Sequence, residues 1–124
     1  MKKLTAALLI IIPSVASAQT MNAEEFNRRA TALQKKGALA LFSRGEIKAL
    51  MKEGQAAGNK AAERRRADVA AGRKPRFCPP QGPQSMGSDE FMKRLAAIPA
   101  AERARIDMTE ATTRIMAVKF PCKA

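Results

Sequence analysis

The sequence predicts an all-α fold, a small bundle of four to five helices stapled by one disulfide. Apolar residues recur at helical spacing in several stretches, and no stretch shows the sustained alternation of a half-buried strand. Short segments led by Asn, Ser or Asp and followed by Glu resemble helix N-caps. The chain has 124 residues, which suits one small domain and leaves no room for a multidomain enzyme.

The first eighteen residues are typical of a cleaved signal peptide. Its parts are Lys2 and Lys3, the apolar residues 4–13, and the small-x-small site Ala16-Ser17-Ala18 before Gln19. The apolar run is about half the roughly 20 residues that a transmembrane helix needs. The residue directly after the cleavage site is Gln19 and not a cysteine, so a lipoprotein anchor is excluded. We expect a periplasmic or secreted protein with no transmembrane segment in its mature form.

Residues 19–124 are expected to form a single helical domain. Segments 22–25, 43–46 and 107–110 resemble capping boxes that open helices, and residues 38–42 form a short apolar turn or helix. Further helices are predicted from Ser88 and over residues 99–106. The expected apolar stripes are Phe26, Ala30 and Leu33; Ile47, Leu50 and Met51; Phe91, Leu95 and Ile98; and Met108, Ala111, Ile115 and Val118.

Two segments are less regular. Residues 52–71 carry Val69 as their one large apolar side chain, so they form a solvated helix, a partner-contact helix or a partly disordered segment. Gly72 is the expected C-terminal stop. Residues 73–87 are rich in Pro and Gly and predict a loop, which either presents a binding element or merely connects two helices.

Composition argues against most enzymes and metalloproteins. The chain has no His, so it lacks the usual near-neutral acid/base group and the commonest metal ligand. Its acidic pairs fall at predicted helix starts, where carboxylates cap free amides. We therefore expect no catalytic residue, no metal and no cofactor.

Cys78 and Cys122 are the only cysteines, and in an oxidising compartment an even pair indicates a disulfide. Two free thiols are the alternative. Much of the apolar content after residue 18 is alanine, which buries little area, so the core should be thin and a covalent staple valuable.

The chain is strongly basic. Loss of Lys2 and Lys3 with the signal peptide lowers its formal charge from +12 to +10. Such a charge attracts anionic partners, namely an acidic protein or an envelope surface such as lipopolysaccharide, and export argues against nucleic acid as a ligand. The alternative is a solvated face that keeps a small protein soluble. The candidate partner-binding residues are Arg64, Arg65, Arg66, Arg73, Lys74, Arg76 and Phe77, of which Phe77 is expected to be exposed in the loop.

The C-terminal half carries an ordered set of motifs. They are Phe77-Cys78-Pro79-Pro80, a Gly-containing turn with Ser85 before a helix with Phe91 and Leu95, Ile98-Pro99-x-x-x-Arg103, residues 111–115, and Phe120-Pro121-Cys122. This order resembles the closing region of the Rap1a/Tai family of type VI secretion immunity proteins. Residues 21–72 lack the further cysteines and the Gly-Tyr-Ile-like buried helix of that family.

The resemblance implies a small exported helical protein with the Cys78–Cys122 bridge. It also implies a role in binding and blocking a peptidoglycan amidase effector, which requires no catalytic group. The alternative function is a basic envelope protein that binds an anionic surface or acts in stress. The sequence leaves the partner and the oligomeric state open, a homo-oligomer included.

Overall fold

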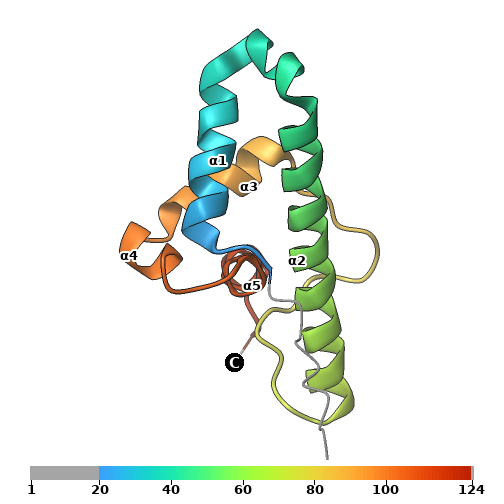
Figure 1. The fold of residues 1–124 in the computed structure, drawn as a ribbon. Helices are drawn as coiled ribbons and strands as arrows, with labels where there is room; N and C mark the ends of the chain where they lie inside the picture. The colour runs from blue at the N-terminus through green and yellow to red at the C-terminus, as the bar shows by residue number, and fades with distance from the viewer. Residues whose placement is uncertain (1–19, 124) are drawn as a thin grey trace, which may run out of the picture.

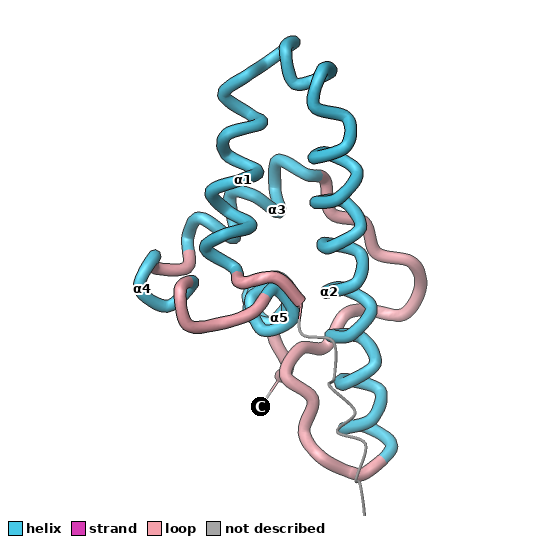
Figure 2. Tube along the Cα trace, in the orientation of Figure 1, coloured by secondary structure: helices cyan, strands magenta, loops and turns pink. Residues whose placement is uncertain are grey.

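The computed structural model describes residues 20–123, which are mostly helical, with loops between the helices and no strand (Figure 2). The elements are α1 (Ala23–Lys36), the 3₁₀ helix η1 (Gly37–Ser43), α2 (Arg44–Ala70), α3 (Ser88–Ala97), α4 (Ala100–Arg103) and α5 (Met108–Lys119). The predicted all-α fold is confirmed. Residues 16–19, with the expected cleavage site, lie outside the described residues. Within residues 20–123, no helix has both the length and the apolar composition needed to cross a membrane.

Helices α1 and α2 form a hairpin that is closed at one end by η1 (Figure 1). Helix α3 lies across the middle of the hairpin, and α5 passes nearer its open end. Helix α2 ends where predicted, because Gly72 has a φ of 71° and lets the Arg73 amide donate to the Asp68 carbonyl at 2.8 Å. The loop that follows runs back along α2 to α3.

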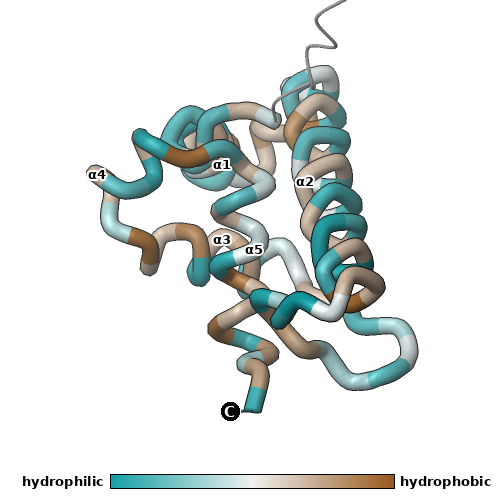
Figure 3. The backbone as a smooth tube through the Cα atoms, turned by 90° about the horizontal axis from the view of Figure 1, so that it is seen from below, coloured by the Kyte–Doolittle hydropathy of each residue, from teal (hydrophilic) through white to brown (hydrophobic). Residues whose placement is uncertain are grey.

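Helix α2 is one continuous helix of 27 residues, so residues 52–70 are ordered. Its buried residues are Leu50, Ala57 and Ala61. Its most extensive packing is against α5, because the short alanine side chains allow the two backbones to approach closely. Figure 3 shows hydrophilic residues mixed with weakly apolar ones along α2. The segment is therefore a largely solvated helix with a narrow buried stripe.

The core is thin, as predicted. Its largest fully buried apolar side chains are Leu95, Met108 and Ile115, and several other members are alanines. Phe26 of α1 packs edge-to-face on Phe91 of α3, with ring centroids 6.1 Å apart. One expectation for the last stripe is wrong, because Val118 is 73% exposed.

Side-chain caps form at two of the three predicted positions. Asn22 Oδ1 accepts from the Glu24 amide at 2.9 Å, and Asp107 Oδ1 accepts from the Glu110 amide at 2.8 Å. The third prediction is wrong, because Ser43 makes no capping hydrogen bond. Helix α2 continues directly from η1, and Ser43 Oγ accepts instead from Lys36 Nζ at 3.1 Å.

The first described residues are fastened to the start of α5. Thr20 Oγ1 accepts from the Thr109 amide at 2.9 Å, and the Met108 amide donates to the Met21 carbonyl at 2.7 Å. The Ala23 amide donates to the Ile106 carbonyl at 3.0 Å. We call these contacts the N-terminal clamp.

Arg103 is a buried cation that holds three segments together. Its Nε donates to Glu24 Oε2 of α1 at 2.5 Å, and its Nη1 donates to the carbonyls of Ala96 and Ile98 at the end of α3. A guanidinium can reach all three acceptors because its donors form a fixed planar fork. Arg103 thus sets the turn from α3 to α4 and its distance from α1.

Arg103→Lys should lower the free energy of unfolding by about 1–2 kcal/mol, since one ammonium cannot satisfy acceptors on three sides. Urea unfolding followed by circular dichroism measures the change. Arg105→Lys is the matched control, because Arg105 is exposed and has no side-chain hydrogen bond in the described structure. Equal stability of the two variants would contradict the role assigned to Arg103.

The predicted disulfide is present. Cys78 and Cys122 are joined at an S–S distance of 2.01 Å, and the Cys78 amide donates to the Phe120 carbonyl at 2.8 Å. The bridge fastens the loop after α2 to the segment that follows α5. It closes a sequence separation of 44 residues around a core that buries little area.

The double substitution Cys78→Ser and Cys122→Ser should destabilise the fold by about 4 kcal/mol, because the unfolded chain regains the entropy of that loop. The melting temperature should fall by about 15–30 °C. Thermal unfolding of the oxidised protein, of the same protein in dithiothreitol, and of the double variant measures this. Three coincident melting curves would show that the bridge does not stabilise the fold.

Candidate functional site

The predicted partner-binding residues gather where the end of α2 meets the loop after it. Phe77 does not have the expected exposure, since it is 4% exposed and part of the core. The Arg65 guanidinium lies 5.9 Å from the centre of its ring, and Arg65 Nε donates to its carbonyl at 3.0 Å. The adjacent Cys78 is held at the end of α5 by the disulfide, which keeps Phe77 between the loop and the helices.

Two further candidates are engaged in ion pairs. Arg73 Nε lies 3.0 Å from Asp68 Oδ1, and Arg76 binds Glu110 of α5 through two nitrogens at 2.5 and 2.8 Å. Arg64, Arg66 and Lys74 are exposed and form no ion pair within residues 20–123. The structure therefore divides the predicted cluster into cations that hold the loop on the helices and cations that face solvent.

Glu110 is the acidic centre of the loop contact. It is partly buried and also accepts from Arg114 Nε at 3.1 Å. The hydrogen bond from Arg76 is the largest cause that lowers the pKa of Glu110 below its usual value of 4.5, and burial opposes it. Hydrogen bonds from Lys119 and then Arg94 lower the pKa of Glu90 on α3 in the same way.

Glu110→Gln should reduce the loss of stability in acid. The pKa of Glu110 is lower in the folded than in the unfolded protein, so its stabilisation is present above 4.5 and is lost as the pH falls through the folded pKa. Urea midpoints at about pH 7 and about pH 3 should therefore differ less in the variant than in the wild type.

Glu63→Gln is the control for that substitution, because Glu63 is exposed and forms no ion pair in the described structure. The loss of stability in acid should be the same in Glu63→Gln as in the wild type. An undiminished acid loss in Glu110→Gln would show that Glu110 contributes nothing to the pH dependence.

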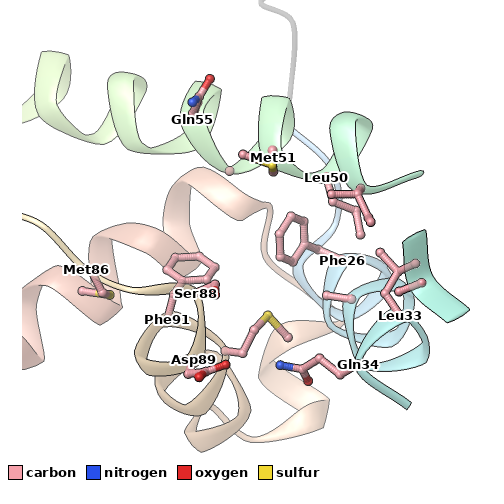
Figure 4. Close-up of a pocket in the computed structure, with 15 residues that line it drawn as sticks. Phe26, Leu33, Gln34, Leu50, Met51, Gln55, Met86, Ser88, Asp89 and Phe91 are labelled. Carbon is pink, nitrogen blue, oxygen red and sulfur yellow. The ribbon is translucent and has the colours of Figure 1, made fainter. Parts of the chain in front are cut away.

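An open apolar groove lies between α1, α2 and α3. Its volume is about 590 Å³. Figure 4 shows the rings of Phe26 and Phe91 in this groove, with Leu50 and Met51 on the α2 side. Its other residues are Ala30, Leu33, Gln34, Ala40, Ile47, Gly54, Gln55, Met86, Ser88, Asp89 and Met92. The apolar stripes of three helices thus face one another without filling the space between them.

Helical spacing in the sequence did not predict this groove. Leu33, Met51 and Phe91 were expected on apolar stripes that face the core, yet Met51 is 62% exposed and the other two are partly buried. The available signal was the concentration of methionine, because Met51, Met86 and Met92 all line the groove. Their convergence depends on how α3 crosses the hairpin, which helical spacing alone does not determine.

Across residues 20–123, no group of three acidic or cysteine side chains is placed to hold a metal ion. No protein-family model, no curated protein and no solved structure matches the chain.

Proposed function

We propose that the chain is an exported binding protein of Rap1a-like type that blocks or sequesters a protein partner, such as a peptidoglycan amidase effector. The observation that carries the proposal is the open groove between α1, α2 and α3 on a scaffold tied by a disulfide. An inhibitor needs a preorganised surface and no catalytic group, because preformed geometry reduces the entropy lost on binding.

The chemistry of the groove suits an apolar or amphipathic segment of a protein. A volume of about 590 Å³ admits several side chains, and three methionines can adapt their shape to them. Gln34, Gln55 and Asp89 also line the groove and can hydrogen-bond a bound backbone or polar face. This combination is typical of sites that take a helix or an extended loop.

Charge favours an acidic partner. Arg44, Lys48 and Lys52 follow one another at intervals of four on α2, next to Ile47 and Met51. The formal charge without the predicted signal peptide is +10, which accelerates encounters with an acidic surface and disfavours basic ones. The proposed site is therefore an apolar groove with a basic border.

The test is co-expression with the amidase effector encoded beside the chain's own gene, directed to the periplasm of a bacterial host. The wild-type chain should restore growth and bind the purified amidase. Met51→Glu should weaken that binding at least about ten-fold, because it places a carboxylate against an apolar partner surface. Calorimetry on the purified pair measures the affinity.

Val69→Glu is the matched control, because Val69 is also exposed on α2 and lies outside the groove. It should bind and protect as the wild type does. Absence of an adjacent amidase gene, or equal weakening by the two variants, would contradict the proposal.

Mass spectrometry of the protein from the periplasmic fraction should find Gln19 at its N-terminus.

A further inference from the structure

The end of the α1–α2 hairpin is apolar on its outer surface. Three side chains of η1 point to solvent, with Leu39 and Leu41 each 65% exposed and Phe42 88% exposed. No residue of η1 is buried. Figure 1 shows η1 at the far end of the hairpin, beyond α3 and α5. We call residues 35–52 the hairpin tip.

The hairpin tip is also the most one-sidedly basic part of the hairpin. Lys35 and Lys36 end α1, while Arg44, Lys48 and Lys52 begin α2. The latter three lie four residues apart, so they share one helix face. They form no ion pair in the described part of the chain.

Glu46, the one acidic residue in the sequence of the hairpin tip, is already paired with an arginine. Glu46 receives two hydrogen bonds from Arg29 of α1, Nε to Oε1 at 2.5 Å and Nη2 to Oε2 at 2.7 Å. The hydrogen bond from Arg29 is the largest cause that lowers the pKa of Glu46. Lys36 also interacts with the charge of Glu46, but Lys35, Arg44, Lys48 and Lys52 form no ion pair within residues 20–123, in contrast to Arg73, Arg76 and Arg103.

Exposed Leu and Phe beside uncompensated Lys and Arg match the two layers of an anionic membrane surface. Apolar side chains enter the boundary between headgroups and acyl chains, and the long cationic side chains reach the phosphates above it. The terminal position of η1 lets these side chains reach a flat surface before α3 or α5 does. We propose that the hairpin tip inserts into an anionic phospholipid bilayer. This inference does not rest on the proposed protein partner.

Vesicle co-sedimentation tests the apolar contribution. The protein should bind vesicles of phosphatidylglycerol and phosphatidylethanolamine and should not bind vesicles of phosphatidylcholine. Leu41→Ser with Phe42→Ser should lower the partition coefficient at least about ten-fold. The matched control is Val69→Ser with Val118→Ser, which removes two exposed apolar side chains elsewhere and should leave binding unchanged. The wild type and both variants carry the same N-terminus, so a difference in vesicle binding between them is due to the substitutions.

Two matched double substitutions test whether the cations of the hairpin tip contribute to vesicle binding. At low salt, Arg44→Gln with Lys48→Gln should lower the partition coefficient about five-fold for each cation removed. Arg64→Gln with Arg66→Gln changes the net charge equally on the other half of α2 and should have a much smaller effect. Equal losses in the two variants would mean that charge acts without a defined site and would overturn the proposal.

Fluorescence reports the depth of insertion. The chain contains no Trp and no Tyr, so Phe42→Trp gives a single reporter in the tip. Its emission should shift to the blue on the phosphatidylglycerol vesicles, and that of Val118→Trp should not. No shift for Phe42→Trp overturns the inference. Binding to lipopolysaccharide but not to phospholipid vesicles would also overturn it. A third contrary result would be a Leu41→Ser, Phe42→Ser variant that loses self-association but still binds vesicles.

Discussion

The covalent link between Cys78 and Cys122 is the constraint on which the remaining packing depends. A core of a few large side chains and several alanines offsets little of the entropy lost on folding. The bridge limits that loss and also places the loop, because it brings Phe77 under Arg65 and Arg76 within reach of Glu110. One covalent bond thus positions contacts on both α2 and α5.

The distribution of charge divides the molecule into two parts. Around α3, α5 and the loop, acidic residues pair with arginines or a lysine, and these pairs join separate elements: Glu24 with Arg103, Glu90 with Lys119 and Glu110 with Arg76. At the far end of the hairpin, Arg44, Lys48 and Lys52 form no ion pair within the described residues. A high net charge therefore does not by itself identify a binding surface, because pairing determines where the charge is available.

The sequence predicted the helices, the loop, the bridge and the thin core, because these follow from local spacing, proline and glycine content and cysteine number. Three features depended on tertiary geometry and were missed. Phe77 is buried and packs against Arg65 of α2. Ser43 is displaced from its cap by the preceding 3₁₀ turn. The groove exists because the apolar stripes of α1, α2 and α3 face one another where α3 crosses the hairpin but do not fill the space between them. The predicted signal peptide lies beyond the described residues.

The N-terminal clamp and the bridge both join positions far apart in the sequence, since Thr20 requires Thr109 and Cys78 requires Cys122. A nascent chain that has not yet released these residues from the ribosome can form the α1–α2 hairpin but cannot close either tie. Closing the bridge requires, besides both cysteines, an oxidising environment in which their thiols can be joined. A product truncated before residue 109 therefore lacks both the N-terminal clamp and the bridge.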